Sequence, residues 1–209
     1  MIAYATRTGT RRNLDALRAA EWRLLICAGG RVEPLTEPWQ YALDNGAWSA
    51  FAQGKPFDVR AFEFALRRFG AKADWTVLPD IVAGGAPSLE MSLKWMRTVL
   101  NESPRALLAV QNGITPEDVR PFLGPRVGIF VGGDTAWKLG TLSDWGHLAA
   151  QVGCWLHVGR VNTARRIFSC ARAEATSFDG TSASRYAVTL PRLDNARRQL
   201  SLLSFKGAP

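Results

Sequence analysis

Short apolar runs alternate with longer segments of helical periodicity along this chain. The runs that predict strands are Ile2–Ala5, Arg23–Ala28, Tyr41–Asp44, Trp75–Pro79, Ala106–Val110, Val127–Val131, Cys154–Val158 and Ala175–Phe178. The segments that predict helices are Arg11–Ala20, Val59–Phe69, Ser88–Leu100, Pro116–Phe122, Thr141–Val152, Thr163–Ala173 and Leu190–Leu203. In one of these segments Leu89, Leu93, Met96 and Leu100 recur at helical spacing, which is typical of a helix that covers a sheet. The connection from Gly29 to Gln40 is predicted to be a loop.

This alternation of strands and helices predicts a parallel sheet built from β/α units. Eight strands fit an α/β fold of the compact (β/α)8 TIM-type barrel, and 209 residues lie near the lower limit of its size. A doubly wound open sheet is the alternative. No internal repeat, low-complexity tract or linker divides the chain, so we expect a single domain over residues 1–209.

Composition narrows the class of protein. Hydrophobic residues make up 47% of the chain, which argues against global disorder. No apolar run approaches the ~20 residues needed to span a bilayer, and the polar segment 5–12 lacks the apolar core of a signal peptide. We therefore expect a cytoplasmic protein without a membrane partner. The cysteines Cys27, Cys154 and Cys170 are odd in number and widely spaced, as reduced thiols are, and the sequence predicts no metal site.

The charge balance points to a polyanionic partner. Lys and Arg number 26 and Asp and Glu 18, which gives a formal net charge of +8. Nucleic acid is the commonest partner of such a chain, and a basic surface that only maintains solubility is the alternative. We expect Trp48, Trp137 and Trp145 to be packing residues rather than platforms on which bases stack.

Polar and glycine-rich segments follow six of the predicted strands, and closure of a barrel would turn them toward one mouth. Asp44, Asp80 and Asp179 supply carboxylates there and Gln111 an amide, and further segments contain Gly132-Gly133 and His157. Such groups suit a planar, hydrogen-bonding ligand such as a purine. Each segment also has a plainer interpretation: Asp44 and Gln111 in ordinary turns, Asp179 as a helix N-cap, and His157 as a core histidine.

The order and spacing of these segments over residues 41–185 resemble the tRNA-guanine transglycosylase superfamily. Asp44-Asn45-Gly46-Ala47-Trp48 is similar to that family's Asp-Ser-Gly-Gly-Phe-Gln, and Val110-Gln111-Asn112-Gly113 to its Val-Gln-Gly-Gly. Gly132-Gly133, His157-Val158-Gly159 and Phe178-Asp179 with Arg185 resemble its Gly-Gly-Leu-Ala, Gly-Val-Gly and nucleophile segments. The zinc-binding cysteine pattern of the tRNA enzymes is absent. Residues 6–14, 131–138 and 179–182 look more like the compact phage-encoded deazapurine DNA modification transglycosylases.

This resemblance implies roles for individual residues. Asp179 would be the catalytic nucleophile that attacks C1′ of a deoxyguanosine, and Asp44 would transfer a proton at the base. The substrate-binding residues would be Asp80, Gln111, Gly132, Gly133 and His157. The residues expected to contact nucleic-acid phosphates are Arg7, Arg11, Arg12, Lys138, Arg160 and Arg185.

The resemblance also implies the partners. They would be DNA and a small 7-deazaguanine such as preQ0, exchanged for guanine without a metal or other cofactor, in the cytoplasm of a bacterial or phage-infected cell. Whether the protein forms a homodimer stays an open question. The alternatives are a transglycosylase that acts on RNA, an N-glycosidase that releases the base to water, and a nucleic-acid-binding barrel without catalysis.

Overall fold

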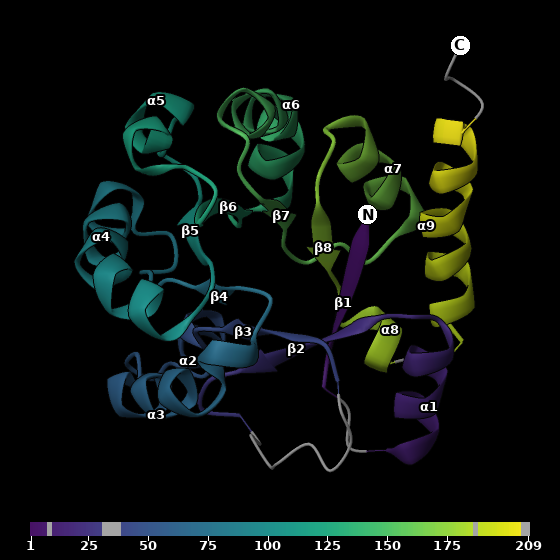
Figure 1. Cartoon of the computed structure of the whole chain (residues 1–209), viewed down its shortest axis with the longest axis horizontal. Coiled ribbons are helices and arrows are strands. Elements are labelled where there is room, and N and C mark those ends of the chain that lie inside the picture. Colours follow the sequence, from purple (N-terminus) through teal and green to yellow (C-terminus); the bar gives the residue numbers. More distant parts are fainter. Residues whose placement is uncertain (8–9, 31–38, 186–187, 206–209) are drawn as a thin grey trace.

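The computed structural model describes residues 1–7, 10–30, 39–185 and 188–205, and within them the strands form a closed parallel barrel surrounded by helices (Figure 1). The strand order around the barrel is the order in the chain, from β1 to β8. The prediction of a (β/α)8 barrel is confirmed, and the alternative of an open sheet is wrong. Among the described residues, none of the helices has the length and apolar character needed to cross a membrane.

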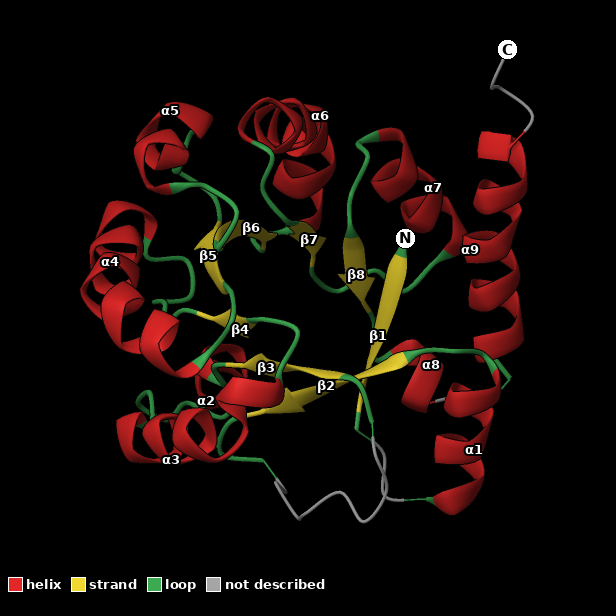
Figure 2. Cartoon of the chain, viewed as in Figure 1, coloured by secondary structure: helices red, strands yellow, loops and turns green. Residues whose placement is uncertain are grey.

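The strands line the centre and the helices form the outer ring (Figure 2). The strands are β1 (Ile2–Thr6), β2 (Arg23–Cys27), β3 (Tyr41–Asp44), β4 (Thr76–Val77), β5 (Ala106–Val110), β6 (Val127–Val131), β7 (Leu156–Val158) and β8 (Ser177–Asp179). The α-helices are α1 (Arg11–Ala19), α2 (Ala47–Ala52), α3 (Val59–Phe69), α4 (Gly85–Glu102), α5 (Pro116–Val119), α6 (Thr135–Val152), α7 (Ala164–Arg172), α8 (Ser182–Arg185) and α9 (Leu190–Phe205). Two 3₁₀ turns, η1 (Gly70–Lys72) and η2 (Arg120–Phe122), follow α3 and α5.

All eight predicted strands are present, whereas the helices differ at several ends. Helix α6 begins at Thr135 rather than Thr141, because the Asp134 carboxylate accepts a hydrogen bond from the Trp137 N–H at 2.9 Å and caps the helix. The short helices α2 and α8 were not predicted, since neither is long enough to show a helical period. Most of the predicted loop from Gly29 to Gln40 lies outside the described residues.

The apolar side chains form two cores, because successive residues of a strand point to opposite faces. The larger core lies between the barrel and its helices. The smaller one fills the barrel interior and consists of Tyr4, Leu25, Ala42, Trp75, Val77, Leu107 and Ala109, with Ile2, Phe130 and Trp155 packed against it. Tyr4 and Trp75 meet edge to face, with ring centroids 5.2 Å apart. The interior is therefore packed, and a ligand can reach the barrel only at its ends.

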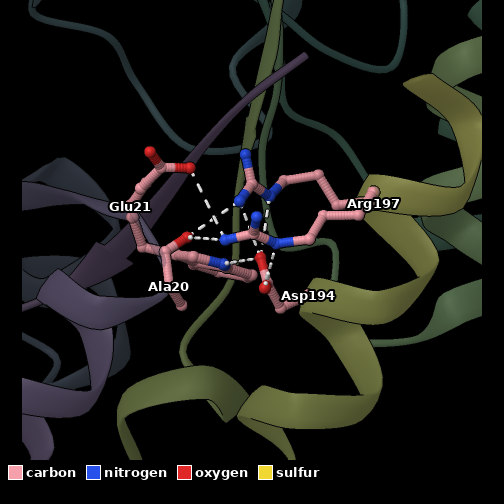
Figure 3. A network of polar contacts seen from close by, with 6 residues as sticks. Ala20, Glu21, Asp194 and Arg197 are labelled. Atoms are coloured by element: carbon pink, nitrogen blue, oxygen red, sulfur yellow. Dashed lines mark hydrogen bonds and ion pairs between the residues drawn. The ribbon is translucent and has the colours of Figure 1, made fainter. Parts of the chain in front are cut away.

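Helix α9 is fastened to the turn between α1 and β2 by a polar network around Asp194 (Figure 3). The Asp194 carboxylate accepts hydrogen bonds from the Trp22 indole at 3.0 Å, Arg197 at 2.7 Å and Arg198 at 2.7 Å. Arg197 also donates to the Ala20 carbonyl at 2.8 Å. These contacts join the last helix to the first β/α unit across the seam where the barrel closes.

Asp194→Asn is expected to lower the free energy of unfolding by about 2 kcal/mol, because two arginines and a buried indole lose a charged acceptor. Burial alone raises the pKa of Asp194, but the hydrogen bonds from Arg198, Arg197 and Trp22 hold it below its usual value. The contribution is therefore present above about pH 4 and is lost as pH falls through the lowered pKa. Urea unfolding at pH 7 and at acidic pH measures both effects.

Asp15→Asn is the matched control. The ion pair of Asp15 with Arg11 lies on the surface, with side chains 53% and 77% exposed. Its loss should change the unfolding free energy by less than about 0.5 kcal/mol. An equal effect of the two substitutions would contradict a special role for the Asp194 network.

Candidate active site

Asp179 is the last residue of β8, at the end of the barrel where the carboxyl ends of the strands meet. Its side chain is buried, and each carboxylate oxygen has a partner on β7 or just after it. Oδ2 lies 3.1 Å from Nε2 of His157, and Oδ1 accepts a hydrogen bond from the Arg160 backbone N–H at 3.3 Å. Helix α8 begins only at Ser182, so the interpretation of Asp179 as an N-cap is wrong.

His157 lies beneath Asp179 inside the barrel and is fully buried. Its ring packs 4.5 Å from Trp75 and 4.9 Å from Phe130, between centroids. Nδ1 lies 2.8 Å from the Ser177 hydroxyl, which accepts a hydrogen bond from the Trp155 indole at 2.8 Å. The prediction of a substrate-binding His157 is therefore wrong, because packing encloses the ring and both nitrogens bind protein groups.

The hydrogen-bond network assigns the protons of His157. Burial lowers the pKa of His157, and the hydrogen bond and charge of Asp179 oppose this effect only in part, so the ring is neutral. The Ser177 hydroxyl can donate its hydrogen to Nδ1 while it accepts from Trp155. Nε2 then carries the ring hydrogen and donates it to Asp179, whose carboxylate is acceptor only.

Asp44 and Asp80 lie at the same mouth, at the end of β3 and just after β4. Asp44 Oδ1 accepts a hydrogen bond from the Gly46 N–H at 2.7 Å. Gly46 has φ of 85°, and a Cβ there would stand 2.4 Å from the Ala28 carbonyl, so this turn requires glycine. Within the described residues, no group of three or more His, Cys, Asp or Glu side chains is arranged to hold a metal ion.

Both carboxyl groups are harder to ionise than an ordinary aspartate. The pKa of Asp44 is raised to about 6, chiefly by burial. The Gly46 N–H lowers this pKa, whereas the charges of Asp179 and Asp80 contribute to its rise. Burial likewise raises the pKa of Asp80 to about 6, against a hydrogen bond from Asn45. The mouth therefore combines a carboxylate held by two N–H donors with two acids that exchange protons near neutral pH.

Asn45 joins two strand tips, a role that the sequence analysis did not assign. Its amide donates to the Leu78 carbonyl and to Asp80 Oδ1, both at 2.7 Å, and its oxygen accepts from the Ala47 N–H at 2.8 Å. The Asp-Asn-Gly turn was the available signal, but the turn alone does not reveal a partner on another strand. Asn45 thus sets the position of Asp80 relative to Asp44.

Gln111 holds the loop after β4 instead of facing the mouth with a free amide. Nε2 donates to the Ile81 carbonyl and the Ser88 hydroxyl, both at 2.7 Å, and Oε1 accepts from the Ala83 N–H at 2.6 Å. Both amide hydrogens are therefore committed to the protein. The prediction that Gln111 reads the edge of a base is wrong for this arrangement.

Gly132 and Gly133 also serve the protein rather than an open subsite. A Cβ on Gly133, where φ is 65°, would stand 2.5 Å from the Trp137 ring, so the space beside it is filled. Gly132 donates its N–H to the Val110 carbonyl at 2.8 Å. The Gly132 N–H is therefore occupied by the protein, and the expectation that both glycines let a ligand approach the backbone stays a prediction.

Arg160 and Trp48 meet across the mouth from opposite sides of the barrel, after β7 and β3 (Figure 1). The Arg160 guanidinium lies over the Trp48 ring, 4.4 Å from its centroid, and donates to the Gly133 carbonyl. Trp48 is 48% exposed, so its predicted packing role is wrong, whereas Trp145 is fully buried as expected. The pair thus places an arginine and a half-exposed indole at the mouth.

The other predicted phosphate contacts divide into surface and interior residues. Arg11 and Arg12 are exposed on α1, Arg185 is exposed on α8, and Arg7 follows β1 at the mouth. Lys138 is only 6% exposed and donates to the Gly159 carbonyl. The expectation that Lys138 belongs to a nucleic-acid-binding surface is wrong, because its ammonium is enclosed between α6 and the tip of β7.

Comparison with known proteins identifies the fold alone. No family model and no curated protein matches the chain. Among solved structures, triosephosphate isomerase of Bartonella henselae is 13% identical, with a TM-score of 0.54 over 94% of this chain and 98% of that one. Tryptophan synthase of M. tuberculosis is 14% identical, with a TM-score of 0.50 over 96% of this chain and 90% of that one. Both are enzymes on a barrel of this type, and the resemblance to transglycosylases stays a prediction.

Asp44→Asn is expected to stabilise the protein at neutral pH. An aspartate in the unfolded chain titrates near pH 3.9, whereas burial raises the pKa of Asp44 to about 6 in the folded protein. Stability from this group is therefore full below about pH 4 and is lost as pH rises through 6. The variant, which keeps an oxygen for Gly46, should gain about 1–2 kcal/mol at pH 7 and nothing below pH 4.

Urea unfolding from pH 4 to pH 8 measures this difference between the variant and the parent. Asp15→Asn, on the surface far from the mouth, serves as the control and should show no such gain. A difference for Asp44→Asn that does not grow between pH 4 and pH 7 would contradict the raised pKa.

Proposed function

We propose that this protein is a DNA guanine transglycosylase, which exchanges guanine for a 7-deazaguanine base through a covalent intermediate on Asp179. The observation that carries the proposal is the pairing of acids at the mouth. Asp179 accepts hydrogen bonds on both oxygens from His157 and Arg160, and these two contacts orient the carboxylate that would attack. Asp44 lies close enough to feel its charge and has a pKa raised to about 6, chiefly by burial, as a proton donor and acceptor requires.

In the first half-reaction, a carboxylate oxygen of Asp179 attacks C1′ of the deoxyribose. The bond from C1′ to the base nitrogen breaks, its electron pair stays on guanine, and the protonated form of Asp44 supplies a proton to the leaving base. The deoxyribose remains attached to Asp179 as an ester. This is the first displacement of retaining glycosidases, in which a carboxylate divides one difficult step into two.

In the second half-reaction, the incoming 7-deazaguanine loses its ring N–H proton to the Asp44 carboxylate and attacks C1′ from the same face as the departed guanine. Asp179 leaves as a carboxylate, and Asp44 regains the proton that it gave. The two inversions retain the β configuration, and the net reaction consumes no proton. Asp44 therefore has to exist in both protonation states near neutral pH, which its raised pKa permits.

Base recognition falls to Asp80 rather than Gln111. Asn45 occupies Asp80 Oδ1, whereas within the described residues Oδ2 accepts no hydrogen bond. That oxygen is available to the N–H groups on the edge of guanine or 7-deazaguanine. The exposed Trp48 indole supplies a ring face above the same acids once Arg160 moves aside.

The charge of the chain supports nucleic acid as the carrier of the base. The formal net charge is +8, Arg7 directly follows β1, and the backbone N–H of Arg160 donates to Asp179. A base in duplex DNA has to leave the stack before Asp179 can reach C1′, which costs a few kcal/mol. Arginine contacts to the flanking phosphates offset part of this cost.

The decisive experiment incubates the protein with guanine-containing duplex DNA and preQ0, digests the DNA and identifies the nucleosides by mass. A 7-deazaguanine deoxynucleoside in the digest is the expected result. An abasic site without an inserted base would instead indicate a hydrolytic glycosidase, and product in tRNA but not in DNA would move the activity to RNA. DNA binding without any of these products would overturn the enzymatic proposal.

Asp179→Asn is expected to lower the exchange of labelled guanine into DNA by at least about 1,000-fold, because an amide cannot form the glycosyl ester. Asp58→Asn is the matched control, since Asp58 is an exposed acid that caps α3 and asparagine caps equally well. The control should melt at about the parent's temperature, and the two variants are compared at a temperature where circular dichroism shows both to be folded. Exchange by Asp179→Asn at the rate of the control would disprove the role of the nucleophile.

A further inference from the structure

Lys138 is connected to Asp179 through a single peptide group. The Lys138 ammonium donates to the carbonyl of Gly159, and the N–H of the same peptide group belongs to Arg160. That N–H donates to Asp179 Oδ1 at 3.3 Å. A positive charge at the carbonyl end of a peptide polarises it and strengthens the hydrogen bond that its N–H donates.

The backbone around this peptide is held in an uncommon conformation. Arg160 has φ of 58°, a left-handed value that costs a residue with a side chain about 1 kcal/mol. A Cβ on Gly159 would stand 2.9 Å from the Phe130 ring, so only glycine fits there. The Gly159 N–H donates to the Val131 carbonyl at 3.1 Å, and Arg166 donates to the Arg160 carbonyl at 3.4 Å. These contacts keep the Arg160 N–H aimed at Asp179.

The charges around Lys138 leave Asp179 as its anionic partner. The titratable groups that act on the Lys138 ammonium are two cations, Arg160 and Arg166, the Cys170 thiol and the Asp179 carboxylate, and His157 is close enough to feel its charge. Burial lowers the pKa of Lys138 to about 8; the charge of Arg160 lowers it and that of Asp179 raises it. A buried ammonium among cations needs a negative group, and Asp179 is the one in reach within the described residues.

We propose that Lys138 is a positioning residue whose charge, acting through the Gly159–Arg160 peptide, strengthens the hydrogen bond that holds Asp179 in place at the mouth. A lysine that merely braced the loop would make the same contact with Gly159, but its charge would not be coupled to Asp179. The consequence for catalysis rests on the proposed function, whereas the coupling itself does not. The charged groups that act on Asp44 are instead the acids Asp179 and Asp80, and its pKa is raised to about 6, chiefly by burial.

A measurement on the lysine itself tests the coupling without any activity. The ¹⁵N signal of the Lys138 ammonium, assigned by its loss in Lys138→Arg, is titrated in the parent and in Asp179→Asn. Because coupling between two sites is reciprocal, removal of the carboxylate charge should lower the pKa of Lys138 by about one unit. Asp58→Asn, which changes an exposed acid at the start of α3, should leave the pKa of Lys138 unchanged. An unchanged pKa in Asp179→Asn would overturn the proposal, even if no base exchange is found.

A kinetic test then separates positioning from substrate contact. Lys138→Met keeps the length of the side chain without its charge, and we expect it to lower kcat for labelled-guanine exchange by about 10–100-fold. KM for DNA should stay within about twofold, since the buried ammonium does not reach phosphate. An unchanged kcat, or a raised KM as the sole effect, would overturn the proposal. If this variant melts before the assay temperature, the titration decides; if the parent lacks exchange, the proposed function fails and the titration still decides the coupling.

Discussion

The pairing of β8 with β1 is the constraint on which the candidate site depends. It closes the barrel in a register that sets Asp179 opposite Tyr4, and the N–H of Gly180 donates to the Tyr4 carbonyl at 3.1 Å. Helix α9 secures this seam, because Asp194 ties it to the turn before β2. Closure brings residues that are far apart in the chain together at one mouth, where the charge of Asp179 raises the pKa of Asp44.

Side-chain hydrogen bonds then join the tips of the strands around that mouth. Asn45 connects β3 to the tip of β4, Gln111 connects β5 to the loop after β4, and Asn112 pairs with Asp134 between β5 and β6. Arg160 continues the series from β7, since its guanidinium reaches Gly133 after β6 and its backbone N–H reaches Asp179 on β8. The acids are thus held by a continuous polar rim, which restricts their motion relative to one another.

The environments of the acids differ because their partners differ. Asp179 accepts hydrogen bonds from His157 Nε2 and from the Arg160 backbone N–H. Burial of His157 inside the barrel lowers the pKa of its ring, which keeps it neutral. At Asp44 and Asp80 burial is the largest influence, and each has a pKa raised to about 6.

The amino-acid sequence by itself determined the eight strands, most helices and the acids at the strand tips, because hydrophobic periodicity and turn residues act over a few neighbouring positions. It could not reveal α2 and α8, which are too short to show a period, or the direction of polar side chains at the mouth. Gln111 turns its amide to the loop after β4, Lys138 lies buried against Gly159, and Trp48 stays exposed beneath Arg160. Only the tertiary structure decided these roles, because each hydrogen-bond partner or ring comes from a segment that barrel closure brings near.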